Sequence, residues 1–574
     1  MKNKIIAFTL LSTLLLSQAC IDELAKVTLR NSATYGALSS EIGLLALAKG
    51  GVYNNGFGAQ YNSIDDGLGV GFFILVYGIH ESMGDNIYVP WGNNNFKFLD
   101  NPTDIKIDNG TVFPMPIGTT QPFEIKLRND RAYGSSNPML VEWTYMYFLN
   151  NACNILLDNV DKTTFSGDAA TKKATVKAWA RFWKGYAYSR LGAMYIGGLI
   201  VDKSNITNGN YVTNTAILAE AKNQFDQSKA LLAGITNLVD YTAVMTSIMP
   251  SYVLEKGIPT PAAFIRNINT LAARNILVSH KVSSTTPGPL PAMAAADWTD
   301  VKTLTATGSG IAATDGVFVT KTTSNPNLSI IDPFFGAAGP YTATNDPTFF
   351  VSEKLVQDFR LGDKRADQNF SLLASPQINR RGRGLNFGTR WYLEDGGNGL
   401  TGVYTYTHTG DFGVDSHYMG ASYEENVLMQ AEARIQTNDI AGGTALIDAV
   451  RNLQGAGLAA IVPTTAAAGL EEIRSERRVA LLFRGLAFYD SRRLGITNDK
   501  SIGGGRGPGG ALNVPGIDHV DGSVVSGAII MFNDGTVQKN SFINYNYLNF
   551  FDVPKNELEF NSPLTGSSIV ASPN

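Results

Sequence analysis

Hydrophobic residues recur every three or four positions in several long stretches of this chain, which is the spacing of one face of an α-helix. One such stretch covers 141–160, and Asn137 and Pro138 in front of it are typical of a helix N-cap and first helical position. A second stretch covers 169–195, where bulky and small residues alternate on the apolar face. We therefore expect two long helices that pack closely against their neighbours.

The clearest helical unit lies further along the chain. Apolar residues form one stripe over 427–435 and another over 446–453, and a polar break at 437–439 separates them. Two helices joined by so short a break pack antiparallel, and their combined length is close to that of a tetratricopeptide-type repeat. A last helix is predicted over 470–494, with Ala431 at the contact between the hairpin and this helix.

Periodicity fades in three segments, near 88–131, 281–420 and 503–551, where Thr, Gly, Pro and aromatic residues dominate and only short β-like runs occur. Such long irregular stretches are uncommon inside a compact domain unless they are ordered functional insertions. No shift in composition marks a domain boundary within 20–574. The pattern predicts a mainly α fold, a tetratricopeptide-like α-α superhelix with long loop-rich insertions and a few short strands.

The N-terminus has the features of a secretory signal peptide. Lys2 and Lys4 precede an apolar run over 5–16, which is too short to span a bilayer. The Ala-Cys ending at Cys20 resembles a bacterial lipobox, although Ser17 stands where leucine is usual. We therefore predict a signal peptide over 1–19 and lipidation of Cys20. The alternative is ordinary secretion with cleavage nearby.

Composition narrows the function classes. The net charge is -4 with a pI near 5.8, and a general nucleic-acid binder would normally carry a basic domain. Only two cysteines occur, so an exported chain of 574 residues has no disulfide framework. If Cys20 is acylated, Cys153 has no partner and is interpreted as a small core residue.

No pattern of a catalytic or metal site emerges from the sequence. The five histidines lie far apart and lack zinc-site spacing, and neither a nucleophile elbow nor a Walker A sequence is present. Adjacent carboxylates such as Glu424 and Glu425 would point in different directions on a helix. We therefore expect no enzyme activity, no cofactor and no metal, and keep a surface glycosidase as the less favoured alternative.

Two loop segments have the makeup of a sugar site. Sugars present flat apolar faces edged by hydroxyls, so a site for them needs aromatic rings beside amide or charged side chains. The predicted ligand-binding residues are Tyr88, Trp91, Asn93, Asn94, Arg390, Trp391 and Tyr392. The alternative is that each tryptophan only pins its loop to the helical scaffold.

Several motifs together resemble those of the SusD/RagB family. The segment 423–434 is similar to the helix around the family's Ala-Glu-Ala core, and 470–495 to its Arg-Glu-Arg-Arg helix. The segment 551–563 matches the closing Pro-x-x-Glu…Asn element, and 176–198 resembles the tetratricopeptide-type helix that ends in a Gly-Gly turn. Within these motifs we interpret four charged residues as structural: Glu476, Arg477, Asp490 and Arg493.

The resemblance implies a function as well as a fold. Such a protein would be anchored by its lipid to the outer membrane, capture an oligomeric nutrient at the cell surface and deliver it to a SusC-like TonB-dependent transporter. Oligosaccharide is the leading ligand class. Peptide capture, in which backbone hydrogen bonds replace aromatic stacking, is the alternative within the same family.

Overall fold

The computed structural model describes residues 37–51, 76–88, 98–116, 118–249, 257–315, 318–321, 350–378, 387–393, 416–462, 464–513, 515–532 and 534–572. The predicted signal peptide over 1–19, Cys20, Trp91, Asn93 and Asn94 lie outside these residues, so what was predicted for them stays a prediction. Within the described ranges, no helix combines the length and the apolar character needed to cross a membrane.

Helices make up most of the regular structure, as predicted. The α-helices are α2 (Glu41–Gly50), α3 (Gly78–Met83), α4 (Gln121–Arg128), α5 (Pro138–Asn159), α6 (Ala169–Met194), α7 (Asn214–Ala233), α8 (Leu238–Ile248), α9 (Pro261–Val278), α10 (Ala295–Leu304), α11 (Glu353–Val356), α12 (Lys364–Asn369), α13 (Tyr423–Gln436), α14 (Ile440–Leu453), α15 (Ala466–Ala480), α16 (Ala487–Arg493) and α17 (Lys555–Phe560). Short 3-10 helices are η1 (Ala37–Ser39), η5 (Arg131–Ser136) and η8 (Lys500–Ile502).

The long helices begin where their capping residues predict. The Asn137 side chain accepts a hydrogen bond from Met139 N at the start of α5, and Asp168 does the same for Ala170 N and Thr171 N at the start of α6. An N-cap of this kind satisfies backbone donors that have no partner inside the helix. Both predicted helices are therefore confirmed, with bounds within a few residues of the expected ones.

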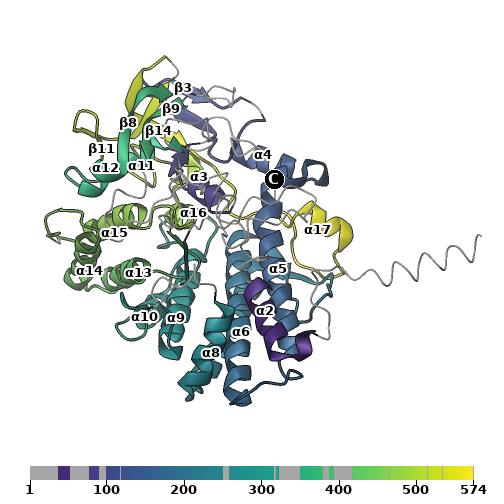
Figure 1. Cartoon of the computed structure of the whole chain (residues 1–574). Coiled ribbons are helices and arrows are strands. Elements are labelled where there is room, and N and C mark those ends of the chain that lie inside the picture. Colours follow the sequence, from purple (N-terminus) through teal and green to yellow (C-terminus); the bar gives the residue numbers. More distant parts are fainter. Residues whose placement is uncertain are drawn as a thin grey trace, which may run out of the picture.

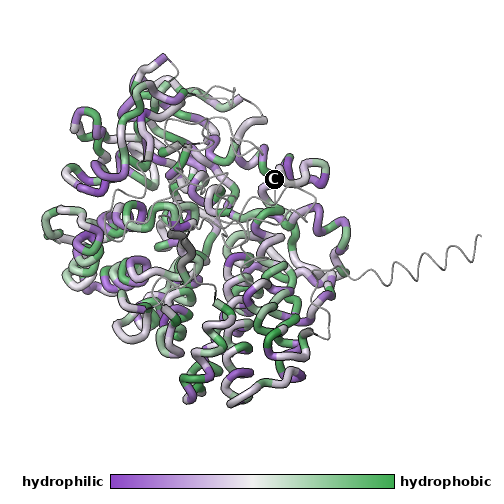
Figure 2. Tube along the Cα trace, in the orientation of Figure 1, coloured by the Kyte–Doolittle hydropathy of each residue, from purple (hydrophilic) through white to green (hydrophobic). Residues whose placement is uncertain are grey.

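The helices pack in sequence order. Helix α5 packs on α6, α6 on α7, and α7 on α9, after which α9 and α10 contact the α13–α14 hairpin (Figure 1). Hydrophobic and hydrophilic positions alternate at short intervals along these helices, as expected for amphipathic elements (Figure 2). The predicted hairpin is confirmed, because α13 and α14 pack on each other and both contact α15.

The predicted helix over 470–494 is wrong in one respect: it is two helices. The chain leaves helical geometry between α15 and α16, where Phe483 has a φ of 55° and Gly485 a φ of 68°. This break is held from outside, because the buried carboxylate of Glu81 accepts a hydrogen bond from Gly485 N at 2.8 Å. In the same break, the guanidinium of Arg484 pairs with Glu424 of α13 at 3.1 Å.

Strands come mainly from the three segments that lack helical periodicity. They are β1 (Ile87–Tyr88), β2 (Asp104–Lys106), β3 (Val112–Pro114), β4 (Gly197–Leu199), β5 (Tyr211–Thr213), β6 (Val319–Lys321), β7 (Phe350–Val351), β8 (Phe370–Gln377), β9 (Phe387–Leu393), β10 (Ser416–Tyr418), β11 (Gly516–Asp518), β12 (Ser523–Val525), β13 (Ala528–Phe532) and β14 (Val537–Asn544).

Six of these strands form one antiparallel sheet in the order β3-β2-β14-β13-β9-β8, which lies at the top of Figure 1. The three loop-rich segments therefore meet in a single sheet. Ile105, Ile530 and Ile543 from three of its strands lie in a small apolar core that is separate from the core between the helices.

The charges interpreted as structural form buried ion pairs. Arg493 of α16 binds Glu432 of α13 through both of its terminal nitrogens, at 2.7 and 2.6 Å, and its Nε lies 2.8 Å from Asp490. Arg477 also binds Asp490, at 3.0 Å. Glu476 accepts from two further arginines, Arg365 at 2.6 Å and Arg451 at 2.9 Å. The structural interpretation of all four residues is confirmed.

Cys153 lies on α5 with none of its surface exposed. Burial raises the pKa of its thiol to about 12, so the group is uncharged and unreactive at ordinary pH. The interpretation of Cys153 as a small core residue is confirmed.

Candidate functional site

The predicted residues Arg390, Trp391 and Tyr392 lie on β9. The Arg390 guanidinium binds Glu353 of α11 at 2.9 Å and Asp518 of β11 at 3.1 Å. Burial alone would lower the pKa of Arg390, but the hydrogen bonds and charges of Glu353 and Asp518 outweigh this effect and raise it. Arg390 is therefore a fixed cation that ties three elements together.

Trp391 does not present its ring to solvent. Only 6% of the residue is exposed, and its Nε1 donates to Glu353 Oε2 at 3.1 Å. The expectation of an exposed indole is therefore wrong, for a physical reason: β9 is an inner strand of the sheet, and Trp391 faces the core while Tyr392 on the opposite side stays half-buried. A sugar-stacking role for Trp391 remains a prediction that would require the ring to become uncovered.

Tyr88 ends β1, and this strand pairs antiparallel with β7, so that Tyr88 lies opposite Phe350. Two residues further on, Ser352 N donates to the carbonyl of Asn86 at 3.0 Å. The next residue is Glu353, whose carboxylate binds both Arg390 and Trp391. The structure thus connects Tyr88 with Arg390 and Trp391 through one short stretch of chain.

A second strand pair is formed by β6 and β10, which run antiparallel with Lys321 opposite Ser416. Tyr77, which precedes α3, donates its hydroxyl to the carbonyl of Tyr418 on β10 at 2.6 Å. We call β1, β7, β9 and Glu353, with the β6–β10 pair, the strand junction.

Sequence reasoning missed Glu353 and Asp518, which orient Arg390 from positions 37 and 128 residues away along the chain. Neither belongs to a motif, so the sequence carries no local signal for them. Across the described ranges, no group of three or more His, Cys, Asp or Glu side chains could hold a metal ion. Among its described side chains, the junction holds the paired guanidinium of Arg390 and the half-buried ring of Tyr392, and binding sites combine polar and aromatic groups of this kind.

Comparison with known proteins points to one fold. No family model matches the chain, and no curated protein matches it either. Among solved structures, a SusD-like carbohydrate-binding protein from Bacteroides vulgatus superposes with a TM-score of 0.54 at 14% identity, over 93% of this chain and 99% of its own. A SusD-like carbohydrate-binding protein from Bacteroides fragilis has a TM-score of 0.51 at 14% identity, over 92% and 99%.

The chain has the SusD-like fold. The motifs that resemble the family have clear structural roles in it. The Ala-Glu-Ala core lies on α13, where Ala431 is fully buried and Glu432 binds Arg493. In the closing element, Glu557 accepts from Trp143 Nε1 at 3.3 Å and from Asn561 Nδ2 at 3.0 Å, which fixes α17 against α5. In this chain, the charged and amide residues of these motifs therefore hold helices together.

Proposed function

We propose that this protein captures a nutrient oligosaccharide at the cell surface and delivers it to a SusC-like TonB-dependent transporter in the outer membrane. The observation that carries the proposal is the SusD-like fold over almost the whole chain, shared with two solved structures described as carbohydrate-binding. Its ligand would be held at the strand junction by Tyr88 and, as the sequence predicts, by Trp91, Asn93 and Asn94.

The strand junction supports this location of the site. A binding site built on loops needs rigid anchor points, since loose supports cost affinity through lost entropy. Here Glu353 binds Arg390 and the indole of Trp391, and Asp518 binds Arg390 from the other side. Tyr88 lies next to this cluster through the β1–β7 pair. The proposal gives Trp91 the stacking role and the buried Trp391 a supporting one.

Anchoring and delivery complete the proposal. A lipid on Cys20 would hold the protein to the outer membrane, since the several acyl chains of a bacterial lipoprotein bind a bilayer firmly. Such a tether keeps the local concentration high at the transporter, so that the protein can open and reclose over the channel without being lost. A ligand stabilises the closed arrangement only by its greater affinity for that arrangement.

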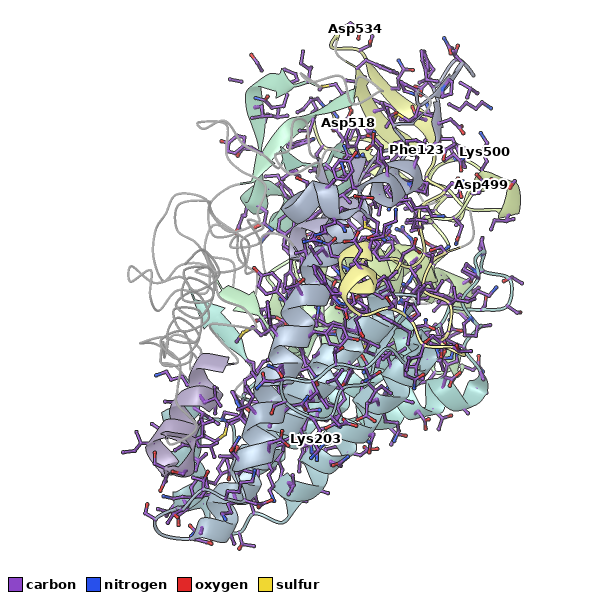
Figure 3. The ribbon with its side chains drawn as sticks, turned by 90° about the vertical axis from the view of Figure 1, so that its right-hand side faces the viewer. Phe123, Lys203, Asp499, Lys500, Asp518 and Asp534 are labelled. Atoms are coloured by element: carbon purple, nitrogen blue, oxygen red, sulfur yellow. The ribbon has the colours of Figure 1, made fainter. Side chains whose placement is uncertain are left out.

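The first test is calorimetry of the purified mature chain against panels of neutral oligosaccharides and of short peptides. We expect an oligosaccharide to bind, and Trp91→Ala to weaken binding about tenfold or more, the usual loss for a central aromatic anchor. Phe123→Ala is the matched control, because Phe123 lies on α4, is 50% exposed and is labelled in Figure 3. Binding of peptides alone would favour the peptide-capture alternative, and release of shortened sugars would indicate a glycosidase.

The second test concerns the partner. Tagged protein is purified from native membranes in mild detergent, and stoichiometric partners are identified by mass spectrometry. We expect a large outer-membrane barrel to co-purify. If none does, and deletion of the gene leaves nutrient uptake unchanged, the delivery step is refuted and a stand-alone adhesin becomes the better explanation.

A further inference from the structure

A cavity lies away from the strand junction, between α5, the segment 199–207 and α17, and helix α17 faces the viewer in Figure 3. Its volume is about 500 Å³, within the range of small-molecule sites in proteins. We call it the α5–α17 groove. None of the residues that line it belongs to the strand junction, so the groove is a separate feature of the molecule.

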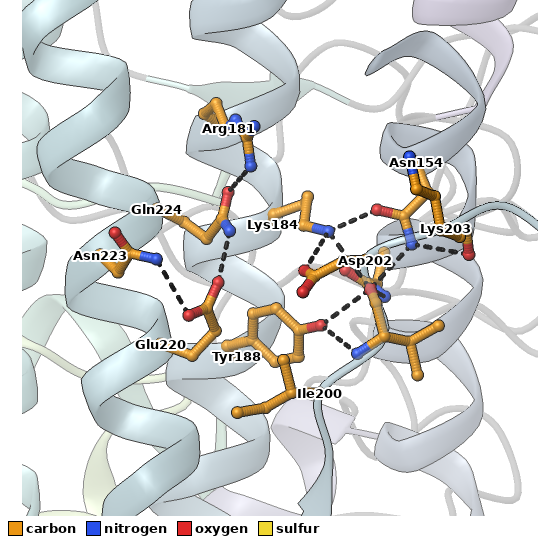
Figure 4. Close-up of polar contacts among 12 residues, drawn as sticks. Asn154, Arg181, Lys184, Tyr188, Ile200, Asp202, Lys203, Glu220, Asn223 and Gln224 are labelled. Carbon is orange, nitrogen blue, oxygen red and sulfur yellow. Dashed lines mark hydrogen bonds and ion pairs between the residues drawn. The ribbon is translucent and has the colours of Figure 1, made fainter. Parts of the chain in front are cut away.

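The walls of the groove are held rigidly by buried polar contacts. The carbonyl of Val201 accepts from Asn154 Nδ2 at 2.8 Å, from Tyr188 Oη at 3.1 Å and from Lys184 Nζ at 3.2 Å (Figure 4). Lys184 is fully buried, so this cluster is costly to disrupt. Trp143 of α5 donates to Glu557 of α17 at 3.3 Å, which links the two helices of the groove. A groove with both walls fixed loses little entropy when a ligand enters.

Aromatic rings stand on opposite walls of the groove. Phe148 projects from α5 with 38% of its surface exposed, and Phe560 from α17 with 74% exposed. The Arg131 guanidinium lies 4.7 Å from the centre of the Phe560 ring. Trp143 and Tyr147 lie deeper in the same groove. Two exposed phenyl rings facing a shared space are apolar surfaces that water covers poorly, and flat C–H faces would cover them well.

Amide side chains supply the polar part of the lining. Asn150 is 1% exposed and donates from its Nδ2 to the carbonyl of Val201, while its Oδ1 has no hydrogen-bond partner among the described residues. Within the same described part of the chain, the Oδ1 of Asn556, on α17, is also buried without a partner. At the rim, Asn151 and Asn205 bind each other. A buried acceptor without a partner is unfavourable, so a hydroxyl donor that reaches either oxygen from the groove is favoured.

Charge selects among possible ligands. Among the described residues that line the groove, the one charged side chain is the carboxylate of Glu557, and the cation beside it, Arg131 on the Phe560 ring, is already paired with Glu559 at 3.5 Å. An anionic ligand would therefore meet the Glu557 carboxylate and compete with Glu559 for Arg131. A neutral ligand with flat C–H faces and several hydroxyl donors satisfies both the exposed rings and the unpartnered amide oxygens.

We propose that the α5–α17 groove is a second saccharide site, which binds one or two neutral sugar residues between Phe148 and Phe560. Its ligand class rests on the proposed function, but its location does not. Sugar hydroxyls donate to the oxygens of Asn150 and Asn556, and the phenyl rings stack on the sugar faces. Such a site would let the protein hold a long glycan at two points, which raises the apparent affinity through high effective concentration.

The test uses the purified mature chain with cellobiose, maltose and chitobiose as probes, read by saturation-transfer NMR and calorimetry. We expect at least one disaccharide to bind, and Phe148→Ala and Phe560→Ala each to weaken it about tenfold or more. Val239→Ala is the control, because Val239 is an 81% exposed apolar residue on α8 away from the groove. Circular dichroism checks that every variant folds.

Trp91→Ala separates this proposal from the proposed function. Disaccharide binding that persists in Trp91→Ala but is lost in Phe148→Ala and Phe560→Ala supports the groove. Glycan binding that is lost in Trp91→Ala and unchanged in both phenylalanine variants refutes the groove and leaves the proposed function standing. The groove proposal is also overturned if no disaccharide gives a transfer signal, or if trialanine binds in a Phe148-dependent manner and the disaccharides do not.

Discussion

Glu81 provides the sharpest test of how a distant side chain holds the break between α15 and α16. Its carboxyl group on α3 is fully buried, and burial raises its pKa from 4.5 to about 7. Hydrogen bonds from Asn86 Nδ2 and Gly485 N oppose this rise without cancelling it. At a pH between 4.5 and about 7, the folded protein keeps a proton on Glu81 that the unfolded chain releases.

The direction in which the stability changes with pH follows from that difference in pKa. The stabilising contribution of the protonated carboxyl is fully present below pH 4.5 and is lost as the pH rises through about 7. A pKa difference of about 2.5 corresponds to about 3 kcal/mol of unfolding free energy. Gln at position 81 is a neutral equivalent of the protonated acid. Its amide can donate to Asn86 Oδ1, which is buried and has no partner among the described residues.

The assay is urea unfolding of the wild type and Glu81→Gln at about pH 5 and about pH 8, with linear extrapolation to water. We expect similar stabilities at the lower pH and a variant more stable by about 3 kcal/mol at the higher pH. Glu559→Gln on the surface of α17 serves as the control and should follow the wild type at both. A difference between wild type and Glu81→Gln that is the same at both pH values would refute the reasoning.

Four further predictions concern a packing contact, an ion pair, the indole of Trp391 and the lipid anchor. Ala431→Trp should overpack the contact of α13 with α15 and cost about 1–3 kcal/mol in urea unfolding, whereas an unchanged midpoint would mean that Ala431 is exposed. Glu432→Gln should cost about 3–5 kcal/mol, because it leaves the buried Arg493 charge poorly paired. Trp391→Ala should lower stability by about 3–5 kcal/mol and weaken glycan binding less than Trp91→Ala does, because the buried indole only supports the site; a larger loss of affinity with unchanged stability would give the indole a ligand role. Mass spectrometry of the membrane fraction should show a mature chain that begins at lipidated Cys20, and Cys20→Ala should release the protein from the membrane; a native protein found wholly in solution would contradict this.

The sequence by itself determined the helical scaffold. Helices α5, α6, α13 and α14 follow from the periodic spacing of apolar residues and from capping side chains beside each helix start. These are local interactions within a few positions of the chain, so they are visible without knowledge of the fold. The charges around Arg493 were also predicted to be structural, from the resemblance of 470–495 to the Arg-Glu-Arg-Arg helix.

Only the tertiary structure decided the rest. Strand β2 pairs with β14 across more than 400 residues, so no local pattern could predict that three irregular segments form one sheet. At the break in the helix over 470–494, Gly485 N donates to Glu81, which is 404 residues away and stabilises the non-helical backbone there. The exposure of a tryptophan depends on what packs over it, and Glu353 and the inner position of β9 bury Trp391. Periodicity and capping act between neighbours in sequence, whereas strand pairing, burial and the walls of a groove depend on residues that only folding brings together.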